Sequence, residues 1–114
     1  MGDSSPQPSW QVEFFTTASG RSPVLDFINS LPTRERGEVR NSLRLLREFG
    51  TRLGFPDARH LQGKLWELRP GHHRLLYFAQ VGHRFVILHA FRKQSGSTPR
   101  QDLDLALRRM SELA

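Results

Sequence analysis

One residue type, cysteine, and several sequence patterns are missing from this chain, and each absence narrows what the protein can be. The 114 residues include no cysteine, which excludes a disulfide framework, a thiolate metal site and a cysteine nucleophile. No apolar run approaches the roughly 20 residues that span a membrane, so we expect no membrane partner. The first ten residues, MGDSSPQPSW, lack the basic and apolar regions of a secretory signal. We therefore expect a cytoplasmic protein.

The common signatures of cofactor and metal sites are also absent. The sequence has no glycine-rich phosphate loop, no HExxH and no cluster of acidic residues. Its five histidines lack the spacing of paired metal ligands. His89 lies within an apolar run, where a hydrogen-bonded core histidine is more common than a catalytic one. We predict a protein without a metal ion or cofactor.

Positive charge is abundant, and it is concentrated in one part of the chain. The net charge is +6, and only two of the 17 basic residues are lysines. Residues 58–101 contain eight basic residues against one acid, Glu67, whereas residues 1–57 are balanced. Clustered cations favour a polyanionic partner, because they release counterions condensed on phosphates. The alternative, a basic surface that serves only solubility, stays open at this point.

The first half of the chain predicts one strand and two helices. We expect residues 1–9 to be flexible and residues 10–114 to form a single domain. The alternating residues 10–17 predict a strand near the edge of a sheet. Ser22-Pro23 begins a short helix that Leu31-Pro32 ends. Thr33 is predicted to cap a second helix that reaches about Glu48, and the two helices should form a hairpin covering one face of the sheet.

The second half predicts three strands and a final helix. Residues 53–61 look irregular, and strands follow at 64–69, 72–80 and 84–91. Their short connections predict an antiparallel meander. Thr98-Pro99 should then cap and begin a helix with an apolar stripe. The resulting order, β-α-α-β-β-β-α, defines an α+β fold with a small antiparallel-rich sheet between a helical hairpin and a C-terminal helix.

Cationic residues stand at the ends of these predicted strands. Arg69 closes one strand and Arg74 opens its antiparallel neighbour, so the two side chains should lie close together. Lys93 directly follows the last strand, and Glu67 is nearby in sequence. This grouping predicts a pocket for a phosphodiester. The alternative is that Arg69 simply pairs with Glu67 and that the other cations are solvated.

At these residues the sequence resembles a known family. The runs LWELR, RLLYF and HAFRKQ, followed by STP and a helix ending LALRRM, are similar to the Gp49-like branch of HigB toxins in the RelE/ParE superfamily. The resemblance implies a RelE-like fold and a type II toxin that arrests translation and growth. It further implies a metal-independent mRNA endoribonuclease that acts at the ribosome. Its partners would be the ribosome, mRNA and a helix-turn-helix antitoxin.

The resemblance also assigns roles to residues. Arg69, Arg74 and Lys93 correspond to the family's basic functional positions, and we take them as the catalytic residues. The arginines would stabilise the phosphate, and Lys93 would act as a second clamp or a proton-transfer group. Weaker candidates for an acid or a base are Glu67, His60, His89 and Tyr77. Candidate RNA-binding residues are Lys64, Arg92 and Arg100.

Two other functions within the superfamily remain open from sequence. One is a ParE-like toxin that binds DNA gyrase and leaves mRNA intact. The other is an inactive nucleic-acid-binding member of the family. The residue that would indicate such a loss of activity is Gln94, which replaces the second lysine of a Lys-Lys pair that is frequent in the family.

Overall fold

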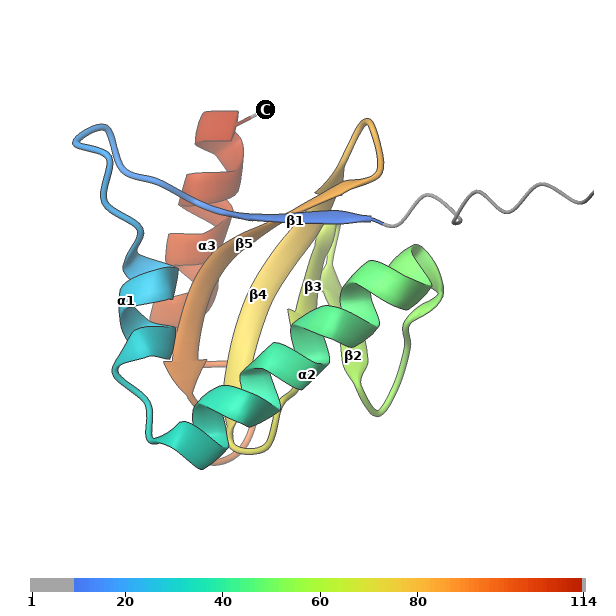
Figure 1. The fold of residues 1–114 in the computed structure, drawn as a ribbon. Helices are drawn as coiled ribbons and strands as arrows, with labels where there is room; N and C mark the ends of the chain where they lie inside the picture. The colour runs from blue at the N-terminus through green and yellow to red at the C-terminus, as the bar shows by residue number, and fades with distance from the viewer. Residues whose placement is uncertain (1–9, 114) are drawn as a thin grey trace, which may run out of the picture.

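The computed structural model describes residues 10–113, which form five strands, three α-helices and one 3-10 turn (Figure 1). The predicted flexible segment, residues 1–9, lies outside the described residues. No helix within the described range is long and apolar enough to cross a membrane. In chain order the elements are β1 (Gln11–Phe14), α1 (Pro23–Asn29), α2 (Thr33–Phe49), the 3-10 turn η1 (Gly50–Arg52), β2 (Ala58–Gln62), β3 (Leu65–Leu68), β4 (His73–Gln80), β5 (Arg84–Arg92) and α3 (Arg100–Leu113).

The strands form one mixed sheet in the order β1-β5-β4-β3-β2. Strands β2 to β5 make the antiparallel meander that the short connections predict. β1 lies at the opposite edge, as predicted, and pairs in parallel with β5. The predicted α+β fold is therefore confirmed, with a fifth strand added.

That fifth strand, β2, corrects the sequence interpretation. Residues 53–61 were expected to be irregular, but Ala58 begins a strand that pairs with β3. Its residues ARHLQ are mostly polar, and a polar strand is typical of a sheet edge, where one side carries no pairing partner. A bulge between His60 and Gln62 further disturbs the alternation of side chains that identifies a strand.

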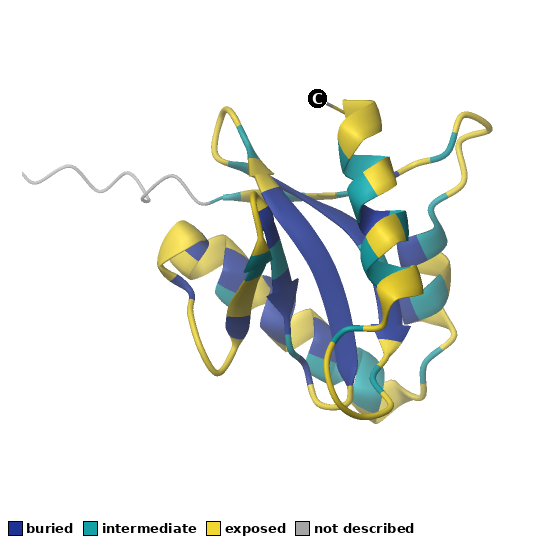
Figure 2. Ribbon diagram, turned by 180° about the vertical axis from the view of Figure 1, so that it is seen from behind, coloured by how far each residue is buried: buried dark blue, intermediate teal, exposed yellow. Residues whose placement is uncertain are grey.

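Helices cover both faces of the sheet, which gives three layers (Figures 1 and 2). The hairpin of α1 and α2 packs on one face, where Val39 and Leu46 contact a core that includes Leu75 and Ile87. α3 packs on the other face, with Ala106 fully buried. We call these the α2 face and the α3 face. The apolar strands β4 and β5 are buried between the layers, as their composition predicts.

Two helix starts differ from the prediction by one residue. Thr33 is already helical, because Pro32 turns the chain into α2 and no side chain caps that end. α3 begins at Arg100, with the Pro99 carbonyl accepting from Leu103. The predicted start of α1 is confirmed, since the Ser22 hydroxyl accepts a hydrogen bond from the Leu25 amide. Single-residue shifts of this kind leave the packing unchanged.

Candidate functional site

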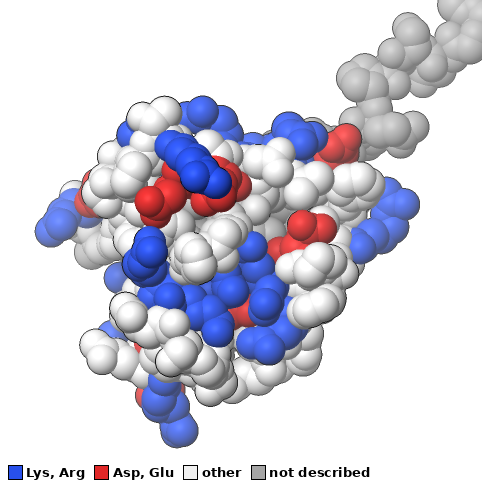
Figure 3. Space-filling model, turned by 90° about the horizontal axis from the view of Figure 1, so that it is seen from below, with Lys and Arg blue, Asp and Glu red and all other residues white. Residues whose placement is uncertain are grey.

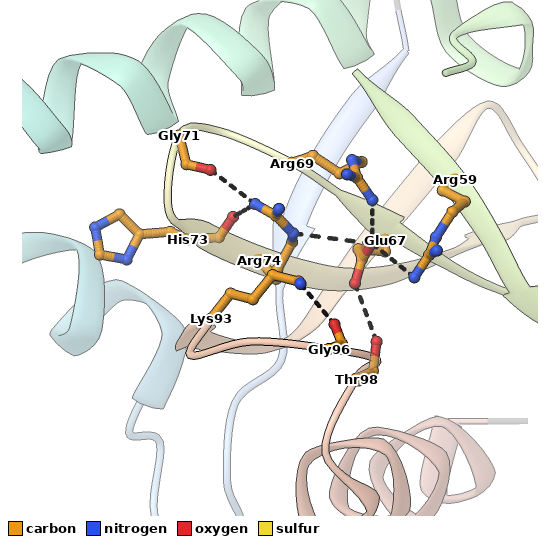
Figure 4. Close-up of polar contacts among 9 residues, drawn as sticks. All are labelled: Arg59, Glu67, Arg69, Gly71, His73, Arg74, Lys93, Gly96 and Thr98. Carbon is orange, nitrogen blue, oxygen red and sulfur yellow. Dashed lines mark hydrogen bonds and ion pairs between the residues drawn. The ribbon is translucent and has the colours of Figure 1, made fainter. Parts of the chain in front are cut away.

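One end of the sheet gathers four cationic side chains around a buried carboxylate on the α3 face (Figure 4). We call Arg59, Glu67, Arg69, Arg74 and Lys93 the basic cluster. The Glu67 residue is 0% exposed. Its Oε2 atom lies 3.0 Å from Nη1 of Arg69, 3.4 Å from Nη2 of Arg59 and 3.9 Å from Nε of Arg74.

Strand pairing brings these residues together. Arg59 of β2 is the direct partner of Glu67 in β3, so both side chains share a face. Arg69 follows β3, and Arg74 stands near the start of β4, across a turn from Pro70 to His73 whose central residues are Gly71 and His72, one position later than predicted. Gly71 has a φ of 57°, a conformation that favours glycine and lets the two strands reverse within this short connection. The predicted proximity of Arg69 and Arg74 therefore follows from a tight turn.

Arg74 is the most constrained member of the basic cluster. Only 8% of the residue is exposed, and its Nη1 donates to the carbonyls of Gly71, at 2.8 Å, and His73, at 2.7 Å. Its Nε is buried and has no hydrogen-bond partner. Burial lowers the pKa of this guanidinium from its ordinary value, and the charge of Arg69 lowers it further. Because its position is fixed by these contacts, the guanidinium is preorganised to stabilise negative charge on a group bound beside it.

The segment between β5 and α3 closes the basic cluster from one side. Nζ of Lys93 donates to the Gly96 carbonyl at 2.6 Å, and the Thr98 hydroxyl donates to Oε1 of Glu67 at 3.1 Å. Thr98, predicted as a helix cap, therefore connects α3 to the buried carboxylate. Lys93 has no carboxylate partner in the described part of the chain, so only a carbonyl competes for its ammonium.

The balance of charge in the basic cluster is strongly positive. Four cations face one carboxylate, and lysine and arginine gather visibly on this side of the molecule, with little acid between them (Figure 3). One part of the second alternative is confirmed, whereas the binding of a phosphodiester stays a prediction. Arg69 does pair with Glu67, and the cluster still has excess positive charge. Such a site can bind a phosphodiester and stabilise negative charge that develops on it.

The weaker catalytic candidates are spread over both faces of the sheet. Tyr77 and His60 belong to the α2 face, opposite Glu67. Burial raises the pKa of the Tyr77 phenol well above its ordinary value of 10, so this group does not ionise near neutral pH. His89 is on the α3 face, and its Nε2 lies 2.6 Å from Oδ1 of Asp102 in α3. The prediction that His89 is hydrogen-bonded within the fold is confirmed.

None of the candidate RNA-binding residues contacts the Glu67 carboxylate within the described part of the chain. Lys64 precedes β3 and lines a cavity with Ala79 at the other end of that strand. Arg92 bonds to Glu35 of α2 at 3.3 Å, and Arg100 forms an exposed pair with Asp104 within α3. No group of three potential metal-ligating acidic or histidine side chains occurs among residues 10–113.

Two residues of the site were not identified as functional from sequence. Arg59 falls in the unrecognised strand β2, and the pairing of that strand with β3 would have placed it beside Glu67. Thr98 was assigned to a helix cap. The signal that could have revealed Thr98 is its position directly before α3, next to a strand end that already carries Lys93.

A second ionic group fastens α2 to the sheet near the basic cluster. The buried ring of His73 contacts Oε1 of Glu35 at 2.7 Å, and Arg92 contacts the same atom. The hydrogen bond from His73 lowers the pKa of the Glu35 carboxyl below its ordinary 4.5, and the charges of His73 and Arg92 act in the same direction. The ionised carboxylate is therefore the form that the fold prefers.

Replacing Glu35 with glutamine should make the stability of the protein less dependent on acid pH. Because the folded-state pKa of Glu35 is depressed, its contribution is present above about pH 4.5 and is lost as the pH falls through the folded value. The variant should thus unfold at a lower temperature at pH 7, and the difference should shrink on acidification. Melting curves from pH 7 to pH 3 measure this. Glu48→Gln, in an exposed pair on the same helix, is the control, and parallel curves for wild type and Glu35→Gln would contradict the expectation.

The fold and the site together describe a small α+β protein with a cationic end, and comparison with known proteins gives its family. A family profile described as phage-derived protein Gp49-like matches residues 26–111, and the chain belongs to this family. A comparison with curated protein sequences gave no match.

A solved structure shares the fold, and a second was also found to be similar. A chain in the crystal structure of the toxin–antitoxin complex RelBE2 from Mycobacterium tuberculosis is 24% identical, with a TM-score of 0.54. The match covers 75% of this chain and 99% of that one. The isolated RelE toxin from E. coli is 16% identical, with a TM-score of 0.48, covering 89% of this chain and 98% of that one. At such identities the likeness is one of fold, and it confirms the RelE-like architecture expected from sequence.

Proposed function

We propose that this protein is the toxin of a type II toxin–antitoxin pair, of the HigB type, and that it cleaves mRNA on the translating ribosome. The observation that carries the proposal is the basic cluster, in which three arginines pair with one buried carboxylate and Lys93 adds a fourth positive charge beside them. Membership of the Gp49-like family and the fold shared with a chain of a toxin–antitoxin complex support it. Growth arrest in the cytoplasm follows from such an activity.

The proposed reaction is an attack of the RNA on its own backbone, in which the named side chains stabilise charge and protonate the leaving group. The 2′-hydroxyl oxygen attacks the adjacent phosphorus, the bond to the 5′ oxygen breaks, and a cyclic phosphate and a 5′-hydroxyl result. Arg69 and Arg74 stabilise the negative charge that grows on the phosphate oxygens. Lys93 exchanges the Gly96 carbonyl for the phosphate, and it is the group within reach to protonate the leaving oxygen.

The proton acceptor in this scheme is not supplied by the basic cluster. Glu67 is fully buried and is held by three arginines and Thr98, which makes it a poor candidate for the group that accepts the 2′ proton. We infer that the ribosome orients the RNA and assists the removal of the 2′ proton. This gives a physical reason for ribosome dependence, since an incomplete site gains most from a substrate held in a reactive geometry.

The partner proposed for the resting state is a helix-turn-helix antitoxin. The M. tuberculosis structure with this fold is a toxin–antitoxin complex. An antitoxin here would neutralise the toxin by covering or distorting the basic cluster. Coexpression of a helix-turn-helix protein encoded beside this one should restore growth.

Primer extension on an mRNA under translation tests the proposed function. Adding the protein should produce new 5′ ends within the coding region, and the same mRNA without ribosomes should stay intact. Cleavage of free mRNA to the same extent would contradict ribosome dependence. Intact mRNA in growth-arrested cells, together with a DNA-damage response, would instead indicate the gyrase-binding alternative. Ribosome or RNA binding without cleavage would indicate the inactive one.

A further inference from the structure

Beside the basic cluster stands an aromatic ring that the fold leaves open to solvent. Phe55, in the segment between η1 and β2, is 74% exposed, the most exposed aromatic residue among the large hydrophobic ones on the described surface. Singly exposed hydrophobic side chains are common on protein surfaces, so the exposure of Phe55 is of interest because of its position beside the basic cluster.

The ring of Phe55 is attached to the basic cluster through Arg69. The Cζ atom of that guanidinium lies 5.3 Å from the centroid of the ring, within the range of a cation–π contact. The same guanidinium donates to Glu67 at 3.0 Å. Glu67 thus fixes Arg69, and Arg69 in turn stands over the ring of Phe55.

The backbone around Phe55 is also tied to the cluster. The Arg69 amide donates to the Asp57 carbonyl at 3.0 Å, and the amides of Asp57 and Ala58 both bond to the Gly54 carbonyl at 3.0 Å. These bonds close the segment on either side of Phe55 into a turn. The ring therefore has a defined position relative to the cations.

We propose that Phe55 is a stacking platform for the RNA base next to the phosphate that the basic cluster binds. This rests on the proposed function only in taking RNA as the ligand. Arg69 covers part of the ring, and the solvent-exposed remainder can receive the flat face of a base. Aromatic stacking beside a cationic groove is a common way of holding single-stranded RNA, and it tolerates any base because every base has a π face.

Stacking on Phe55 would fix the direction of the RNA chain, which the basic cluster alone cannot do. The cations can bind a phosphate but cannot fix the direction of the chain on either side of it, because phosphate contacts carry no information about the bases. A base held on Phe55 would fix the nucleotide on one side of the scissile bond. Alignment of the 2′ oxygen with the leaving oxygen depends on such positioning.

Binding of an uncleavable trinucleotide tests the proposal directly. The probes are an RNA trinucleotide with 2′-O-methyl groups, matched trinucleotides that are abasic at one position, and inorganic phosphate, each titrated against the full-length protein. Phe55→Ala should weaken binding of the intact trinucleotide by about ten- to a hundredfold, the range that one stacked base supplies. It should leave unchanged the affinity for phosphate and for one of the abasic analogues. Phe55→Trp should retain the affinity.

Phe49→Ala is the matched control, because Phe49 is also an exposed phenylalanine, at 42%, and Arg69 is not stacked on it. It should bind the trinucleotide like the wild type. The proposal is overturned if wild type binds the intact and every abasic trinucleotide equally. It is also overturned if Phe55→Ala binds the intact one as wild type does, or if the variant loses only antitoxin binding.

Failure of the stacking proposal and failure of the nuclease proposal give different results. A wild-type protein that prefers the intact trinucleotide through Phe55, and yet leaves translated mRNA intact, supports stacking and refutes the nuclease. A protein that cleaves translated mRNA equally well with phenylalanine or alanine at position 55 supports the nuclease and refutes stacking.

Discussion

Replacing Glu67 with alanine should lower the free energy of unfolding by about 3–5 kcal/mol, the usual cost of removing one partner from a buried ionic group. Glu67 is fully buried and faces three guanidinium groups. Without it, Arg59 and Arg69 can turn toward water, but the 8% exposed Arg74 cannot. The variant would bury a positive charge beside other positive charges, together with an unpaired Thr98 hydroxyl.

Thermal and urea denaturation measure this loss, which for a domain of this size corresponds to a melting temperature lower by about 10 °C or more. Glu13→Ala serves as the control, because Glu13 also pairs with an arginine, Arg84, but is half exposed, and it should cost less than about 1 kcal/mol. Glu67→Gln separates charge from shape and should be destabilising as well. Equal melting temperatures for Glu67→Ala and Glu13→Ala would show that the buried carboxylate does not stabilise the basic cluster.

Replacing Lys93 with alanine should lower the rate of mRNA cleavage by about 100- to 1000-fold, the range seen when one charge-stabilising donor is removed from an active site. Within the described chain, the Lys93 ammonium bonds only to the Gly96 carbonyl. Its side chain should therefore contribute little to the stability of the fold. The melting temperature should therefore stay within a few degrees of the wild type. Loss of cleavage without loss of stability would identify Lys93 as a residue of the reaction.

The chain contains its own matched control for this experiment. Lys64 is the other of the two lysines, and it lies toward the opposite end of β3 from Arg69. Although Lys64 is a candidate RNA-binding residue from sequence, its place before β3, away from Arg69, leads us to expect that Lys64→Ala cleaves at close to the wild-type rate. Full activity of Lys93→Ala would remove Lys93 from the proposed site. Arg74→Ala is a less informative variant, because it should abolish cleavage and also leave two backbone carbonyls without their donor.

The fold was largely predictable because short local sequence signals identify most of its helices, strands and turns. The apolar runs of β4 and β5, the turn that follows Pro70 and the Ser22-Pro23 helix start are each encoded within a few neighbouring residues. The edge strand β2 was not predicted, because its mostly polar residues form no apolar run of the kind that identifies β4 and β5. Its existence depends on pairing with β3, which is a property of the assembled sheet.

The site was predictable only where its residues flank strands. The closeness of Arg69 and Arg74 follows from a two-residue turn, and the pairing of Arg69 with Glu67 was one of the two alternatives. The sequence could not show that Glu67 binds Arg59, Arg74 and Thr98 at once. Those contacts join residues up to 31 positions apart, and they exist only after β2 and the start of α3 are in place.

The strand pairing of the sheet also implies an order of assembly. β2 to β5 are joined by short connections, so each pairing closes a small loop at low entropic cost. β1 pairs with β5 only by bringing Gln11 to Arg84, the most distant pairing in the sheet. Contacts of such sequence separation form slowly. Most of the basic cluster lies in the part of the sheet that can form first, so a newly made chain would acquire its cationic end before β1 completes the edge.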